Sequence, residues 1–181
     1  MVQGNLNAKE MEGLLEGLAE QIVRGLPKGP EGRCSVPVAL VGIRSRGEIL
    51  AQRLQAKLEN RLGAAVDRGT LDITLYRDDL NQMGYQQPRV RATEIDFDLD
   101  DRLVVLVDDV LNTGRSVRAA LDALADLGRP RAIRLAVLID RGQRELPISA
   151  DYVGQRLDVA ADKRVNVYVR EVDEREEVAI E

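Results

Sequence analysis

The residues best suited to chemistry lie within 104–117, where an apolar, strand-like run ends in two adjacent carboxylates, Asp108 and Asp109. Four residues after this pair comes a polar group made of Thr113, Gly114, Arg115 and Ser116. Carboxylates can hold sugar hydroxyls or a metal ion, whereas the free N–H groups and the dipole of a helix start suit a phosphate. Gly114 allows the backbone to approach oxygen atoms closely. A phosphorylated sugar carries both kinds of group.

Alternating strand and helix patterns must position this segment. Continuous apolar runs predict strands covered on both faces at 36–43, 103–107 and 132–139. Alternation predicts a half-exposed strand at 71–76, and shorter edge strands are expected at 165–169 and 178–180. Amphipathic spacing predicts a first helix with Asn7 as its N-cap, a second after Gly47 and a third from about Arg115 to Gly128. The chain is therefore predicted to be one α/β domain over 1–181, with a mostly parallel sheet flanked by helices.

A second polar segment follows the first predicted strand and opens the next helix; it consists of Arg44, Ser45, Arg46 and Gly47. Two arginines beside a helix start could neutralise an anion, and the alternative is a solvated surface loop. The polar segment 77–88 shows no periodicity, which indicates a mobile loop.

Composition excludes several classes of function. The chain lacks histidine, so Ser-His-Asp catalysis, Cys-His catalysis and histidine metal ligands are excluded. One cysteine, Cys34, allows no internal disulfide and is typical of a reducing cytoplasm. With 26 basic and 31 acidic side chains, the net charge of −5 does not favour nucleic acid, and we expect no DNA partner. Apolar runs are too short to span a membrane, so we expect a soluble cytoplasmic protein.

Other classes of protein that place acidic residues at a strand end fit this sequence less well. The chain contains no G-x-x-x-x-G-K-[ST] motif, which disfavours a P-loop NTPase. None of its four lysines follows a buried strand as a receiver domain would require. A simple N-cap remains as the structural alternative for the Thr-Gly pair.

The 104–117 segment resembles the phosphoribosyl-pyrophosphate (PRPP) motif of type I phosphoribosyltransferases. Further segments resemble the PyrR family, whose members are uracil phosphoribosyltransferases that also regulate the pyrimidine operon; these segments are 41–47, 71–79, 126–130 and 139–147. The resemblance extends from about 36 to 180, with a weaker match in the N-terminal helix.

This resemblance implies the type I phosphoribosyltransferase fold with a small hood built from the N- and C-terminal segments. It implies that uracil and PRPP give UMP and diphosphate. Mg²⁺ would bridge diphosphate and ribose oxygens, with no direct metal ligand from the protein. A homodimer or homotetramer is also implied.

The resemblance also implies a role for each candidate residue. Asp108 and Asp109 would hold the ribose hydroxyls and stabilise the developing cation, and residues 113–116 would hold the 5′-phosphate. Residues 44–47 would hold the diphosphate, with a non-proline cis peptide between Arg44 and Ser45. Arg77 would contact diphosphate from a flexible lid at 76–88. Arg141 and, more weakly, Asp140 would read the uracil.

The chain departs from the family in two ways. Asn112 stands where the family has tyrosine, and we expect catalysis to survive this change. The RNA-binding surface lacks basic residues: the first helix carries Glu10, Glu12, Glu16 and Glu20, while Gln143, Ser149 and Gln155 replace a histidine, an arginine and a lysine, and Arg144 remains. RNA binding is therefore disfavoured. Two alternatives stay open, a UMP-sensing RNA-binding attenuator and a phosphoribosyltransferase for another base.

Overall fold

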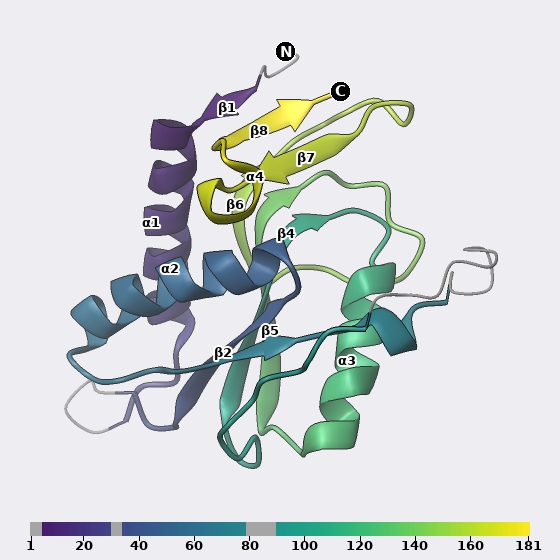
Figure 1. Ribbon diagram of the computed structural model, residues 1–181. Coiled ribbons are helices and arrows are strands. Elements are labelled where there is room, and N and C mark those ends of the chain that lie inside the picture. Colours follow the sequence, from purple (N-terminus) through teal and green to yellow (C-terminus); the bar gives the residue numbers. More distant parts are fainter. Residues whose placement is uncertain (1–4, 30–33, 79–89) are drawn as a thin grey trace.

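The computed structural model describes residues 5–29, 34–78 and 90–181 of the chain. Its centre is a five-stranded parallel sheet with helices on both faces (Figure 1). In spatial order, the strands are β3 (Asp67–Leu71), β2 (Val38–Ile43), β4 (Leu103–Leu111), β5 (Ala132–Asp140) and β6 (Tyr152–Arg156). The predicted α/β class is confirmed.

Three helices cover this sheet. The helices α1 (Ala8–Gly25) and α2 (Arg46–Leu62) lie on one face and α3 (Arg115–Leu127) on the other. Strand residues alternate between the two layers, since Val105 and Val107 belong to the core under α1 and α2. Val104 and Leu106 belong to the core under α3. Burial on both faces explains the continuous apolar run of β4.

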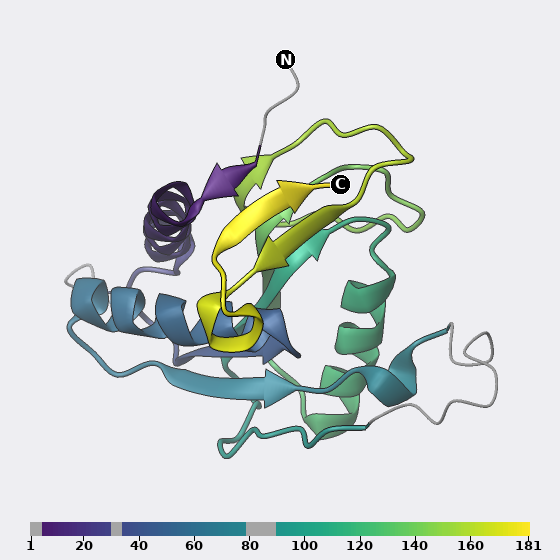
Figure 2. The same cartoon turned by 45° about the horizontal axis from the view of Figure 1, so that its top comes forward.

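A second, antiparallel sheet forms a hood from the two ends of the chain. It contains β1 (Leu6–Asn7), β8 (Glu177–Ile180) and β7 (Val165–Tyr168), in that order, with the short helix α4 (Arg170–Asp173) between β7 and β8. Figure 2 shows α4 close to the start of α2. The predicted hood of N- and C-terminal segments is confirmed.

The prediction of a strand over 71–76 is wrong beyond its first residue. Strand β3 ends at Leu71, and Thr74–Tyr76 form a 3-10 helix, η2. The Asp72 carboxylate accepts hydrogen bonds from the Thr74 N–H at 3.0 Å and the Thr74 hydroxyl at 2.5 Å. Such side-chain bonds to nearby backbone compete with strand pairing and start a turn.

The order of the strands determines where a ligand can bind. The chain passes from β2 to β3 on one side and later places β4 against the other side of β2, with all pairs parallel. Open parallel sheets bind ligands outside the carboxyl ends of their strands at such a reversal. The segments after β2 and β4 are the two that carry the predicted chemistry.

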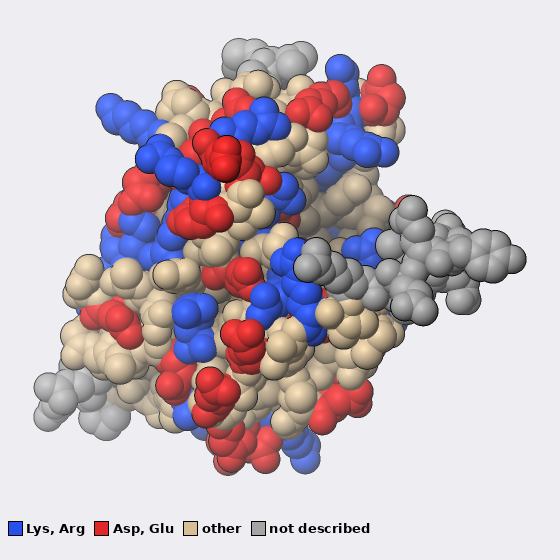
Figure 3. All heavy atoms as spheres, viewed as in Figure 1, with Lys and Arg blue, Asp and Glu red and all other residues tan. Residues whose placement is uncertain are grey.

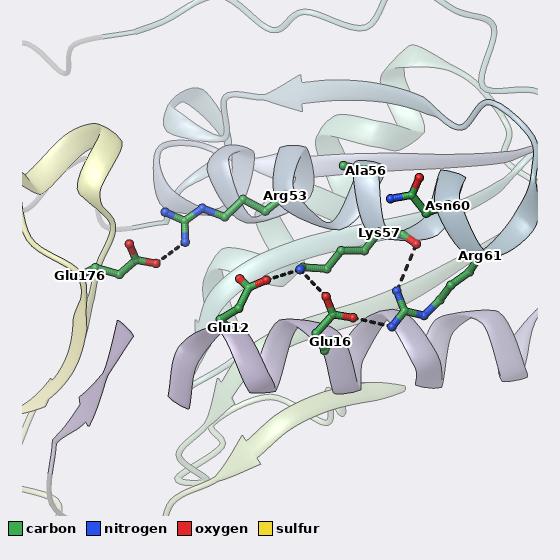
Figure 4. A pocket seen from close by; sticks show the side chains of 8 residues that line it. All are labelled: Glu12, Glu16, Arg53, Ala56, Lys57, Asn60, Arg61 and Glu176. Carbon is green, nitrogen blue, oxygen red and sulfur yellow. Dashed lines mark hydrogen bonds and ion pairs between the residues drawn. The ribbon is translucent and has the colours of Figure 1, made fainter. Parts of the chain in front are cut away.

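Ion pairs join α1 to α2 along a groove that is separate from the carboxyl edge of the sheet (Figure 4). The Lys57 ammonium contacts the carboxylates of Glu12 and Glu16, the latter at 2.6 Å, and the Arg61 guanidinium pairs with Glu16. The Lys57 side chain is 14% exposed, so its aliphatic stem packs within the interface. No helix in the described part of the chain combines the length and the apolar character that crossing a membrane requires.

We expect Lys57→Met to lower the free energy of unfolding by about 1 kcal/mol, because it keeps the apolar stem and removes two ion pairs. The difference from wild type should shrink in 1 M salt, which screens charges within about 3 Å. Thermal unfolding at low and high salt measures both. Lys9→Met, at an exposed position of α1, is the matched control. Equal destabilisation by both variants would contradict the structural role of this ion-pair cluster.

Candidate active site

The two carboxylates lie at the carboxyl end of β4 and are largely withdrawn from water. Asp108 is 8% exposed, and its Oδ1 accepts a hydrogen bond from the Asp109 N–H at 3.0 Å. The Asp109 carboxylate accepts one from the Val110 N–H at 2.8 Å. Backbone donors therefore hold both groups in place.

Burial raises the pKa of Asp108 well above its ordinary value, and the neighbouring Asp109 carboxylate raises it further. Burial also raises the pKa of Asp109, against hydrogen bonding from the Val110 N–H and the positive charge of Arg46, which lower it. Two adjacent carboxylates in a desolvated place repel each other when both are charged. A cation or hydroxyl donors would therefore stabilise the charged forms of this pair.

The first turn of α2 lies directly against the end of β4. A Cβ atom on Gly47 would be 2.5 Å from the Val107 carbonyl oxygen and 3.3 Å from the Asp108 Cα. Only glycine permits this approach, which brings the segment 44–47 beside the acidic pair. The peptide bond between Arg44 and Ser45 is cis, as the sequence resemblance predicts.

Both arginines of this segment have acidic partners. The Arg44 guanidinium contacts Glu94 at 2.9 Å and Glu48 at 3.2 Å. Arg46 makes two hydrogen bonds to the Asp173 carboxylate of α4, at 2.7 and 3.1 Å. These bonds raise the pKa of Arg46 and lower that of Asp173. Arg46 thus joins the hood to the acidic pair.

A small cavity lies at the start of α3. Gly114 precedes the helix with a φ of +94°, a conformation that favours glycine. The cavity has a volume of about 180 Å³ and is lined by Arg77, Asp78, Thr113, Arg115 and Ser116. The predicted phosphate-binding residues are therefore brought together, and Arg77 lies with them.

Arginines of α3 hold the first residues of the predicted lid, 76–78. The Arg115 guanidinium pairs with Asp78 and with Glu145, each at 2.6 Å. Arg118 donates to the Tyr76 carbonyl at 2.8 Å, and the Tyr76 hydroxyl donates to Asp126 at 2.6 Å. The remainder of the predicted lid, residues 79–88, lies outside the described residues.

The turn after β5 carries the predicted base-reading residues. Arg141 is 7% exposed, and its Nη2 donates to the Gln143 side chain at 3.0 Å and to the Ala160 carbonyl at 3.4 Å. Its Nε–H is buried without a partner among the described residues. The Asp140 carboxylate accepts from the Gly142 N–H at 3.0 Å and contacts Arg144 at 2.5 Å. Asp140 thus caps the turn, and the side chain of Arg141 is held against it with its Nε–H unsatisfied among the described residues.

An open cavity of about 390 Å³ adjoins this turn. Its lining comes from the turn itself, from the segment before β6 and from the end of β6: Asp140, Arg141, Gly142, Arg144, Ile148, Ser149, Arg156, Leu157 and Asp158. The turn after β5 therefore has space beside it for a ligand or for solvent.

Sequence reasoning missed the residues that hold the predicted site residues in place. Asp173 and Glu94 bind the two arginines of the segment 44–47, and Arg144 binds the turns after β4 and β5. Asp173 and Glu94 lie 127 and 50 residues from the arginines they bind, and Arg144 lies 32 residues from Asn112. Only the resemblance of 139–147 to PyrR pointed to one of them.

Within the described ranges, no three histidine, cysteine, aspartate or glutamate side chains gather to hold a metal ion. Asp108 and Asp109 supply carboxylate oxygens, the ligand type that Mg²⁺ prefers. The donor set therefore fits a magnesium ion only when a substrate supplies most of the remaining oxygens.

The arrangement of sheet, hood and site defines a phosphoribosyltransferase. A family model described as a phosphoribosyl transferase domain matches residues 3–173. Solved structures with the same fold include hypoxanthine phosphoribosyltransferases from Trypanosoma cruzi and Staphylococcus aureus. The first has a TM-score of 0.69 at 19% identity and covers 97% of this chain and 93% of its own. The second has a TM-score of 0.65 at 18% identity, covering 97% and 90%.

Curated relatives identify the family to which the chain belongs within this class of enzymes. The bifunctional protein PyrR of Thermus aquaticus is 53% identical over 175 residues, covering 97% of this chain and 93% of its own length. The bifunctional protein PyrR of Deinococcus radiodurans is 52% identical over 168 residues, covering 93% and 88%. The chain belongs to the PyrR family.

We expect Asp108→Asn to raise the free energy of unfolding at pH 7 by about 1 kcal/mol, or Tm by about 2–4 °C. The charged form of Asp108 is penalised in the folded state, so this cost is present above its raised pKa and disappears as the pH falls toward the ordinary value of 3.8. Thermal unfolding at pH 7 and near pH 4 measures the difference.

The exposed Asp96→Asn, which makes the same change in net charge, is the control. A lower Tm for Asp108→Asn than for wild type at pH 7 would contradict the burial cost assigned to this carboxylate.

Proposed function

We propose that this protein transfers the phosphoribosyl group of PRPP to uracil, giving UMP and diphosphate. One observation supports this most directly: an acidic pair, a phosphate-sized cavity at a helix start and an arginine segment meet at the carboxyl edge of one parallel sheet. PRPP carries ribose hydroxyls, a 5′-phosphate and a diphosphate, and each of these groups suits one of the three. Membership of the PyrR family favours uracil as the base.

The site would act by position and charge. When diphosphate leaves, positive charge develops on the ribose ring, and the carboxylates of Asp108 and Asp109 at the end of β4 would stabilise it. Arg44 and Arg46 would receive the leaving diphosphate, while Thr113, Gly114, Arg115 and Ser116 hold the 5′-phosphate. Arg77 lines the phosphate cavity, so we propose that it assists at this end of the substrate. A reaction of this kind requires no protein nucleophile.

Mg²⁺ is proposed to enter with PRPP. It would neutralise diphosphate charge and make that group a better leaving group. Asp108 and Asp109 would contribute at most two carboxylates, so diphosphate, ribose and water would supply the other oxygens.

The uracil is proposed to lie against the turn after β5. The buried Arg141 Nε–H has no partner among the described residues, and leaving such a donor unsatisfied costs about 1–3 kcal/mol. A uracil carbonyl would satisfy it. Asp140 would hold the turn, because its carboxylate already accepts from Gly142 and Arg144.

RNA binding at the family's usual surface is proposed to be weak. The structure does bring the two parts of that surface together, since the Gln21 side chain of α1 exchanges two hydrogen bonds with the Val153 backbone of β6. The glutamates of α1 have partners within the chain: Glu10 closes the N-cap with Asn7, and Glu20 pairs with Arg24. RNA is therefore proposed to bind weakly because cations are missing from this surface, and not because the surface carries unpaired acidic charge.

The side chains that remain at this surface add little positive charge. Gln143 bonds the Val159 carbonyl at 2.7 Å and Arg141, so its amide faces the protein. On the face of the molecule that Figure 3 shows, basic and acidic side chains are interspersed. Phosphate contacts need clustered cations.

We expect diphosphate release from PRPP with uracil, and much slower release with orotate, hypoxanthine or guanine. Asp108→Asn and Asp109→Asn should each lower kcat by about 100-fold or more, because each removes charge that stabilises the transition state. Asp96→Asn should retain wild-type rates. A purine preference would exclude uracil as the natural base, and full activity in Asp108→Asn would remove that residue from the site.

We expect a pyrimidine-operon leader RNA to bind weakly at moderate salt, with or without UMP, because few cations face the shared surface of α1 and β6. Titration by fluorescence anisotropy measures this. Submicromolar binding that UMP strengthens would establish an RNA-binding regulator and overturn the proposed loss of that function.

A further inference from the structure

One guanidinium outside the predicted site connects three segments at the carboxyl edge of the sheet. The Arg144 Nη1 donates to the carbonyls of Leu111 at 3.3 Å, Asn112 at 2.8 Å and Gly142 at 2.7 Å. Its Nε donates to the Ile148 carbonyl at 3.0 Å, and its Nη2 contacts Asp140 at 2.5 Å. The side chain is 22% exposed. Arg144 thus bonds the turn after β4, the turn after β5 and the approach to β6.

These bonds fix the orientation of two peptide planes just before the phosphate cavity. In a trans peptide, the carbonyl of one residue and the N–H of the next lie in one plane and point in opposite directions. The Leu111 carbonyl also accepts from the Arg141 N–H at 3.1 Å, so Arg144 shares in orienting that peptide, and it holds the Asn112 carbonyl as well. The N–H groups of Asn112 and Thr113 are thereby directed away from the 142–148 segment. The orientation of these donors is what a phosphate at the start of α3 depends on.

The neighbouring backbone continues the same arrangement. The Thr113 carbonyl accepts from the N–H groups of Glu145 at 3.0 Å and Leu146 at 3.1 Å. The next donor, the Gly114 N–H, is thereby directed away from that segment as well. A Cβ on Gly114 would meet the Ile148 side chain at 3.3 Å, so the segment packs closely on the turn. Arg144 anchors the segment to which the whole turn is bonded.

We propose that Arg144 is a positioning residue for the phosphate-binding turn: it sets the affinity for the 5′-phosphate of PRPP and UMP without touching either. Its donors face four carbonyls and a carboxylate of its own chain, so the guanidinium serves the turn and is unsuited to contacting an RNA phosphate. This inference rests on the proposed assignment of residues 113–116 to the 5′-phosphate.

The test compares Arg144→Gln and Arg144→Lys with Arg134→Gln. Arg134 is the control because it also pairs with a carboxylate, that of Asp151 at 3.6 Å, is 48% exposed and lines neither cavity of the site. Initial rates give kcat and the KM values for PRPP and uracil, calorimetry gives the Kd for UMP, and thermal unfolding reports stability.

We expect Arg144→Gln to raise the KM for PRPP and the Kd for UMP by about tenfold or more. The KM for uracil at saturating PRPP should rise by a smaller factor, through the bonds of Arg144 to Asp140 and Gly142. Arg144→Lys should recover part of the loss, since an ammonium can bond some of the same carbonyls. Arg134→Gln should match wild type in all five quantities.

Two results would overturn the inference. The first is an unchanged KM for PRPP in both Arg144 variants. The second is an equal loss for PRPP and uracil that follows the fall in Tm, because general destabilisation would produce that pattern. The failure of the proposed function looks different: wild-type protein would then form no UMP from PRPP and uracil and bind no UMP.

Discussion

Two carboxylates held side by side at the buried end of a strand are the constraint on which the rest of the site depends. Withdrawing charged groups from water is unfavourable, and their mutual repulsion adds to the cost. The fold offsets this with backbone N–H donors to Asp108 and Asp109 and with the nearby charge of Arg46. A protein gains nothing in stability from such a pair. Its presence is best explained by a ligand that requires concentrated negative charge.

Positive charge around the site is held in place by acidic residues from several parts of the chain. Asp173 of the hood binds Arg46, and Glu94 binds Arg44. Along α2, Arg53 bonds Glu171 and Glu176, while Lys57 bonds α1. A single helix therefore links the first helix, the hood and the acidic pair. The hood is positioned over the site by ion pairs as well as by its apolar core.

The sequence was sufficient for features that depend on local patterns. The apolar runs of β2 and β4 and the 135–139 part of β5 are buried on both faces, and the capping box at Asn7 starts α1 where the pattern predicts. The turn at 113–116 could be located from the sequence because its glycine and hydroxyls are adjacent along the chain. The strand predicted over 71–76 ends early, since Asp72 bonds Thr74 and local capping prevails over the alternating pattern.

Long-range partners could not be predicted in this way. Arg46 and Asp173 are 127 residues apart, and Arg44 and Glu94 are 50 apart. Nothing in the pattern of one charged residue specifies which distant residue it will meet, because the pairing is decided by the packing of whole elements. The sequence shows only that residue 144 is a cation, and the orientation of the Arg144 side chain toward the turn after β4 follows from the structure alone.

The pairing of both arginines changes how diphosphate recognition should be understood. Arg44 and Arg46 are not unpaired cations awaiting an anion, since each already bonds a carboxylate. In the proposed reaction, diphosphate would share or replace these carboxylates, so the net electrostatic gain is a difference between two sets of charge-assisted bonds. Such an exchange favours moderate affinity and allows the product to leave. It also makes the hood responsive to the leaving group, because the carboxylate that Arg46 bonds belongs to α4.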